Sequence, residues 1–145
     1  MKILLFALSA AALALSACQI GGGSYIGVYE VKCPGQSRPA VRAEMRSIAT
    51  SVANGLGVVF DETNEDQESL NLILREIDDK NGHERPGLVF SFVNVTGDQF
   101  GITIAKDGPQ EDGAIQRFRS QIETVLKRTD NVTWRFSVSH WTMAK

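Results

Sequence analysis

The chain has 145 residues and a formal net charge of −2 at neutral pH. This length fits a single domain, and the weakly acidic balance argues against nucleic-acid binding, which uses a basic surface. Apolar residues make up 43% of the chain, which is enough for a packed core.

The first predicted element is a secretory signal and not part of the fold. Met1 and Lys2 form a short positive start, and the apolar run 3–15 is interrupted only by Ser9. A membrane-spanning helix needs about 20 apolar residues, so this run better suits a signal peptide that is removed from the mature protein. No later apolar run is long enough to span a bilayer.

Four residues at the end of this run indicate a lipid anchor. Leu15, Ser16, Ala17 and Cys18 resemble the lipobox of bacterial lipoproteins, in which a leucine, two small residues and a cysteine stand in this order. The resemblance covers the first 18 residues. It implies cleavage between Ala17 and Cys18, a diacylglyceryl group on the Cys18 thiol and, in many species, a fatty acid such as palmitate on the new amine. The alternative is an ordinary signal with a coincidental cysteine.

The residues after the cysteine set the expected location. Gln19 stands where the family's inner-membrane retention signal in enteric bacteria is an aspartate. The resemblance therefore implies the periplasmic face of the outer membrane in a host with two membranes. Residues 18–24 form the lipidated cysteine and a glycine-rich tether that reaches about 20 Å at most. We expect one globular domain, 25–145, held close to the membrane.

The first part of this domain should contain a strand and a helix. Residues 25–32 are rich in β-forming side chains, and the turn residues Pro34 and Gly35 end that strand. A helix should begin near Pro39 and close at Gly55 and Gly57. Its apolar residues recur at helical spacing and should face the core: Val41, Met45, Ile48, Val52 and Leu56.

A short strand is predicted next, at 58–60, followed by an acidic segment. Residues 61–68 include five acidic residues and no basic residue, which favours a solvated loop. An EF-hand calcium loop would need a glycine in its middle and a glutamate at its end. The segment lacks both, so no calcium site is expected.

Four more strands and a second helix should complete the domain. Strands are predicted at 70–77, 88–95 and 100–105, with a long turn over 78–87 and a hairpin turn at 96–98. A helix over 111–128 should bury Ile115, Phe118, Ile122 and Val125. The last strand, 131–141, alternates between apolar and polar residues.

The element order β-α-β-β-β-β-α-β predicts an α+β fold. Each amphipathic helix has one apolar stripe to bury, so a mostly antiparallel sheet with both helices on one face is the simplest two-layer sandwich. The order is ferredoxin-like, with an inserted hairpin, by analogy of pattern only. Such an analogy does not assign a function.

Few residues of the chain are suited to catalysis. His83 and His140 have no neighbours at the spacing of zinc ligands, so we expect no metal and no cofactor. If Cys18 carries lipid, Cys33 is the remaining thiol. We interpret Cys33 as a small buried side chain; the alternatives are a disulfide between chains and a nucleophile activated by a histidine.

Two features are candidates for a binding surface. Arg38, Arg42 and Arg46 are spaced by four and would form a basic stripe near the tethered end, able to contact anionic headgroups, lipopolysaccharide phosphates or an acidic partner. The alternative is a solvated helix face, with Glu44 nearby.

The second candidate is the sheet face that the helices leave uncovered. One set of residues should point toward the helices: Leu72, Leu74, Leu88, Phe90, Phe92, Ile102 and Ile104. The opposite face would then present the apolar residues Ile73, Ile77, Val89, Val93 and Val95, more than a solvated face should. Such a patch favours a partner or a homodimer unless another segment covers it. Trp141 is a further candidate, as an interface anchor or a packed C-terminus.

These features lead to three hypotheses. The first is a non-enzymatic binding protein, anchored by lipid at the periplasmic side of the outer membrane, which binds an envelope protein in assembly or as an immunity or inhibitor protein. The second is a module that binds lipid or lipopolysaccharide through the arginine stripe. The third is a small envelope hydrolase that uses Cys33.

Overall fold

The structure is a computed structural model that describes residues 24–58, 60–65, 69–75, 87–93, 97–107, 111 and 113–141. The predicted signal, the lipobox and most of the tether lie outside these residues, as do Ile77, His83 and Val95. Within the described ranges, no helix combines the length and the apolar character required to cross a membrane.

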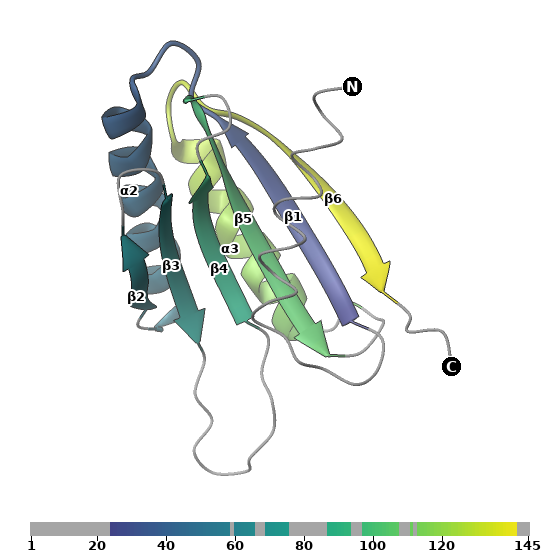
Figure 1. Ribbon diagram of the computed structural model, residues 1–145. Coiled ribbons are helices and arrows are strands. Elements are labelled where there is room, and N and C mark those ends of the chain that lie inside the picture. The colour runs from purple at the N-terminus through teal and green to yellow at the C-terminus, as the bar shows by residue number, and fades with distance from the viewer. Residues whose placement is uncertain are drawn as a thin grey trace.

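The order of the elements is the predicted one (Figure 1). The elements are β1 (Ser24–Lys32), α2 (Arg38–Leu56), β2 (Phe60–Glu65), β3 (Ser69–Arg75), β4 (Gly87–Val93), β5 (Gln99–Asp107), α3 (Gly113–Arg128) and β6 (Thr133–Trp141). The strands form one sheet in the order β2-β3-β4-β5-β1-β6, and every neighbouring pair is antiparallel.

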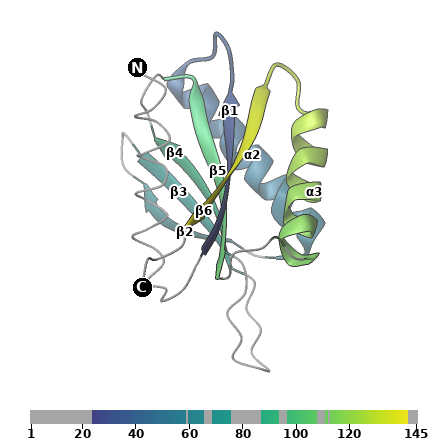
Figure 2. The same cartoon turned by 90° about the vertical axis from the view of Figure 1, so that its right-hand side faces the viewer.

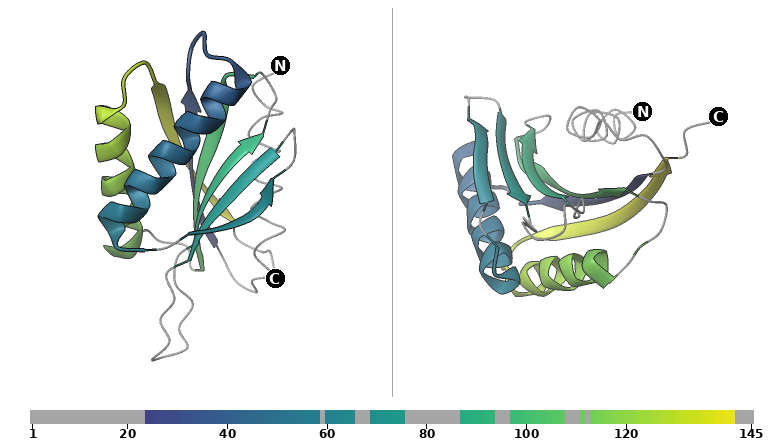
Figure 3. Two further views of the ribbon diagram at one scale, coloured as in Figure 1. Left: turned by 90° about the vertical axis from the view of Figure 1, so that its left-hand side faces the viewer. Right: turned by 90° about the horizontal axis from the view of Figure 1, so that it is seen from below.

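The fold is a two-layer α+β sandwich, as predicted. Figure 3 shows the sheet curving around α2 and α3, which both lie on one of its faces. α2 contacts β3, β4 and β5, while α3 contacts β5 and α2. The ferredoxin-like comparison remains an analogy of pattern.

The core forms between the helices and the facing side of the sheet. All five apolar residues predicted for the first helix are buried. In α3, Ile115, Phe118 and Ile122 are buried as expected, but Leu126 is the fourth buried residue and Val125 is only partly buried. Phe118, Ile122 and Leu126 follow one another at intervals of four, which keeps them on one face of a helix with 3.6 residues per turn. Val125 lies to the side of that face. The sheet contributes Tyr25, Tyr29, Val31, Phe100, Ile102 and Ile104.

The ends of α2 follow from local chemistry, with one correction. The helix begins at Arg38, with Pro39 in its first turn. Gly57 caps its C-terminus in the left-handed conformation, at a φ of 67°, which favours glycine. Gly55 was expected to close the helix but lies inside it, where a Cβ would collide with the Gln121 side chain. The absence of a side chain at Gly55 therefore leaves room for the Gln121 side chain of α3 against α2.

The acidic segment is the main error in the predicted elements. Residues 60–65 form β2, which pairs with β3 and shifts register between Glu62 and Asn64. Phe60, expected at the end of a short strand, instead begins this one, and Val58 lies outside any strand. Charged residues are suited to a strand at the edge of a sheet, because one side of the backbone faces water. Acidic composition therefore does not separate a loop from an edge strand.

Candidate functional site

The strand register brings several of the predicted surface residues together. Ile73 pairs with Val89, Val89 with Thr103, and Thr103 with Val28. Residues that pair across antiparallel strands share one face of the sheet. The residues on either side of Thr103 in the chain, Ile102 and Ile104, are in the core. The row from Ile73 to Val28 therefore lies on the face opposite the helices.

This helix-free face changes character across the sheet. Val93 pairs with Ser69, four positions along from the Ile73–Val89 pair, and so joins the same face. Near the centre, Ile26 and Thr103 are buried, with exposed fractions of 6% and 3%. Toward β6 the face becomes polar, with exposed residues at every second position: Thr133, Arg135, Ser137 and Ser139. The apolar part is thus central and the polar part lies at one edge.

The arginine stripe exists, but its predicted location is wrong. α2 does begin at Arg38, so Arg38, Arg42 and Arg46 lie along one helix at intervals of four; Arg38 is exposed and the other two are partly buried. β1 starts at the tether and α2 begins beyond its other end (Figure 1). A nine-residue strand is about 26 Å long. The stripe therefore starts at the end of the domain farthest from the tether, which weakens the lipid-binding hypothesis.

Trp141 lies at the opposite end from Arg38. Its backbone pairs with Ser24, the first residue of β1, where the tether joins the domain. The structure therefore does not bring Trp141 and the arginine stripe into one site.

Cys33 is a buried free cysteine, as interpreted from the sequence. Its backbone N–H donates to the Asp98 carbonyl oxygen at 2.8 Å, which fixes the chain where β1 ends. Burial, with smaller contributions from the negative charges of Glu44 and Asp98, raises the pKa of the Cys33 thiol to about 11. The thiol is therefore neutral at physiological pH and is a poor nucleophile.

The backbone also separates Cys33 from His140. His140 pairs with Tyr25 near the start of β1, whereas Cys33 follows the last residue of that strand. Eight residues of extended chain span about 26 Å, so these two residues cannot form a catalytic pair. His83 lies outside the described residues. The hydrolase hypothesis gains no support from this geometry.

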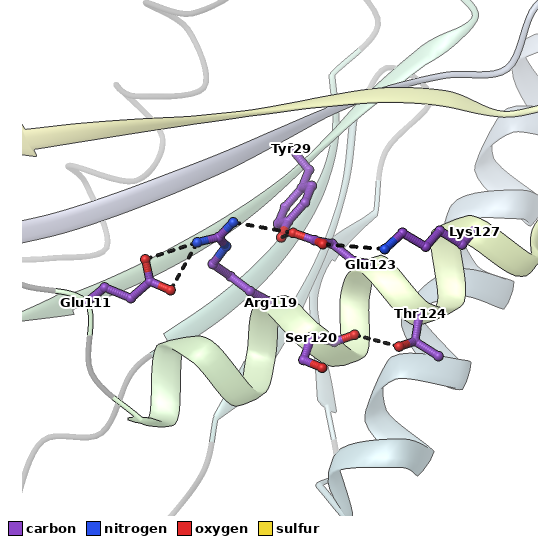
Figure 4. Close-up of polar contacts among 7 residues, drawn as sticks. All are labelled: Tyr29, Glu111, Arg119, Ser120, Glu123, Thr124 and Lys127. Carbon is purple, nitrogen blue, oxygen red and sulfur yellow. Dashed lines mark hydrogen bonds and ion pairs between the residues drawn. The ribbon is translucent and has the colours of Figure 1, made fainter.

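A polar cluster that the sequence analysis missed lies between α3, β1 and β6 (Figure 4). Arg119 donates from Nη1 to both carboxylate oxygens of Glu111, each at 3.0 Å. Its Nη2 lies 3.4 Å from Glu123 Oε1, and the same Glu123 oxygen accepts a hydrogen bond from the Tyr29 hydroxyl at 2.9 Å. Lys127 adds a longer ion pair with Glu123 at 3.9 Å.

The cluster holds α3 against the last strand and leaves no activated group. The Arg119 guanidinium lies over the Phe136 ring of β6, at 4.1 Å from its centroid, a favourable cation–π geometry. Burial, followed by the hydrogen bond and charge of Glu123, raises the pKa of Tyr29 above its ordinary value, although Arg119 opposes this. Burial alone would lower the pKa of Arg119, but its bonds to Tyr29 and Glu111 raise it. Tyr29 is therefore neutral and Arg119 charged.

One part of this cluster could have been found in the sequence. Arg119, Glu123 and Lys127 are spaced by four, the spacing of ion pairs along a helix. The Tyr29 contact joins residues 94 positions apart, and no local pattern indicates it.

Across the ranges that the structure describes, no group of three or more His, Cys, Asp or Glu residues is placed to hold a metal ion. No protein-family model matches the chain, and no curated protein matches it.

Proposed function

We propose that this protein is a lipid-anchored, non-enzymatic binding protein of the bacterial envelope that binds another envelope protein from the periplasmic side of the outer membrane. One observation carries the proposal: Leu15, Ser16, Ala17 and Cys18 precede the folded domain directly. Ser24 already belongs to β1, so five residues, or six steps of the chain, separate the lipid-bearing Cys18 from the sheet. Such a chain spans about 20 Å when fully extended.

The chemistry of the described side chains supports binding over catalysis. The Cys33 thiol is buried with a raised pKa, and Arg119 contacts carboxylates on two sides. Neither residue has the activated state that a nucleophile or a general base requires. A protein in envelope assembly, or an immunity or inhibitor protein, needs a positioned surface instead.

The anchor is tested by lipid labelling in cells. Cells that express the full chain are fed an alkyne analogue of palmitate, and the protein is followed by fluorescence and membrane fractionation. We expect label and outer-membrane recovery for the unaltered chain, and neither for Cys18→Ala. An unlabelled, soluble wild-type chain would contradict the proposal.

The binding role is tested by cross-linking in intact cells. We expect a defined adduct with one envelope protein, and a weaker one with Cys18→Ala, because that variant is no longer confined to the membrane. Recovery of nothing beyond abundant lipoproteins would contradict the binding role, whatever the labelling shows.

A further inference from the structure

β6 has a long backbone edge with no further strand beside it among the described residues. It pairs with β1 from Thr133 to Trp141 without a register shift, and it is the last strand of the sheet in the described part of the chain. Figure 2 shows β6 beside β1, with α3 along the same side of the molecule. In an antiparallel pair, alternate residues bond to the neighbour, so half of the β6 backbone groups face outward.

β6 lacks the features that usually protect an exposed edge. Such edges carry charges, prolines or bulges that discourage pairing. β6 has no proline and one permanently charged residue, Arg135. Arg135 donates from Nε to Glu30 of β1 at 2.6 Å, which partly offsets its charge, while its side chain stays 60% exposed. Val138 is the one large hydrophobic residue that is exposed, at 42%, among the residues whose side chains the structure describes.

The two faces of β6 differ in chemistry. Trp134 and Phe136 are partly buried against the core, and Val138 continues their row. The alternate row of Thr133, Arg135, Ser137 and Ser139 is exposed. A strand added beside β6 would meet apolar side chains on one face, and hydroxyls with one cation on the other.

We propose that the β6 edge binds an extended segment of a partner protein as an additional strand of the sheet, a mode known as β-augmentation. The segment has apolar residues at alternate positions, facing Phe136 and Val138, and hydroxyl or acidic residues between them, facing Ser137 and Arg135. This inference rests on the proposed function, because it names the surface and the partner chemistry of that binding role.

Membrane attachment favours a partner segment over a second copy of this chain. Two β6 strands paired by a two-fold axis run in opposite directions, which places the two tethers at opposite ends of the dimer. Each strand is about 26 Å long and each tether reaches about 20 Å, so both anchors reach one membrane only if the strands lie flat on it. A partner segment imposes no such restriction.

The first test measures hydrogen exchange of the full mature chain in detergent, with a synthetic probe. The probe is a nonapeptide in which valine alternates with threonine and aspartate; the control peptide has the same composition without alternation. With the alternating peptide at up to about 1 mM, we expect exchange of the outward β6 amides to slow at least about fivefold. The control peptide should leave exchange unchanged.

Variants at Val138 link this protection to the edge. Val138→Lys places a charge on the edge and should weaken peptide binding at least about tenfold, whereas Val138→Ile should bind within about threefold of wild type. Exchange in the absence of peptide checks that β1 and β6 remain paired in both variants. Unslowed β6 exchange, equal binding of both peptides, or a stable dimer through β6 would each overturn the inference.

Photo-cross-linking in cells separates this inference from the proposed function. A photoreactive amino acid is placed at Ser137 on β6 or at the exposed control positions Thr50 on α2 and Gln116 on α3. An adduct at Ser137 that Val138→Lys abolishes supports the inference. Adducts only at Thr50 or Gln116 would overturn it and leave the binding function standing. A lack of adducts at all three positions would contradict both.

Discussion

The two edges of the sheet differ in length, charge and regularity (Figure 1). β2 has six residues, a register shift and three carboxylates, Asp61, Glu62 and Glu65. β6 has nine residues, an unbroken register and one permanent charge. Bulges and charges discourage the pairing of an edge with other strands. The difference indicates that the molecule protects one edge and leaves the other available.

The available edge is also firmly attached to the core. Both aromatic rings of β6 pack on the Tyr29 ring of β1. The distance between ring centroids is 4.5 Å for Phe136 and 5.7 Å for Trp134. Arg119 covers Phe136 from the helix side. An edge held in this way is preorganised, so a partner strand would not have to order it first.

The largest effect is expected from removing the aromatic contact beneath β6. Phe136→Ala should lower the free energy of unfolding by about 3 kcal/mol, since it deletes a ring packed on Tyr29 and Arg119. Phe136→Leu should cost about 1 kcal/mol. Urea titration measures both. If both variants lowered the free energy of unfolding only slightly and by the same amount, the aromatic contact would not be what holds β6.

A pH titration of stability tests the burial of Cys33 at the end of β1, the strand that pairs with β6. Because burial raises the pKa of Cys33 to about 11, the unfolded chain loses its thiol proton first as pH rises. The free energy of unfolding should therefore be unaffected by this group below pH 9 and fall by about 2 kcal/mol between pH 9 and 11. Tyrosine side chains also ionise at the upper end of this pH range. Cys33→Ala should therefore remove the fall in unfolding free energy at the lower end, where only the thiol of these two groups titrates. An unchanged slope in that variant would assign the fall to other groups.

A smaller effect is expected at Gly27, which faces β6. A Cβ at Gly27 would lie 3.0 Å from two atoms of the Phe136 ring and 3.2 Å from Tyr25. Gly27→Ala should displace Phe136 and lower the free energy of unfolding by about 1 kcal/mol. In the Phe136→Leu background the same change should cost less, because the smaller side chain leaves room. Equal costs in both backgrounds would rule out this contact as the cause.

The smallest change in stability is expected from substitutions in β2. The same substitutions should clearly change the self-association of the protein. Replacing both Asp61 and Glu65 with Thr should alter the free energy of unfolding by less than about 0.5 kcal/mol, because acidic residues on an edge strand are seldom part of a core. The edge, left with Glu62 as its one carboxylate, should then self-associate, which sedimentation velocity would detect. Asp61→Glu with Glu65→Asp is the matched control. A monomeric Thr variant would show that the register shift and Glu62 are together sufficient to protect β2.

Periodic patterns predicted much of the fold. The residues from Val41 to Leu56 repeat every three or four positions, and all five are buried. The alternation in residues 131–141 predicted β6, with Trp134 and Phe136 against the core. Such patterns can be found without the structure because they reflect burial of one face of an element. Gly55 and the acidic β2 were misassigned because their roles depend on what packs or pairs beside them.

The candidate sites were less predictable than the fold. Ile73, Val89 and Val93 were assigned to one face, and the register agrees. The stripe at Arg38 was expected near the tether but starts at the far end, because β1 runs the length of the sheet before α2 begins. The Arg119 cluster depends on Tyr29, which is distant in the chain.

The chain alone was sufficient to derive the α+β class, the element order, the helix stripes and a lipid anchor that stays a prediction. All of these depend on neighbours within a few residues, where spacing and chemistry act directly. Only the folded sheet shows which strands lie at its edges. It also shows that Trp141 lies beside Ser24. The physical reason is that strand pairing joins distant segments through backbone groups that are alike in every residue. Local sequence therefore carries little information about which pairs form.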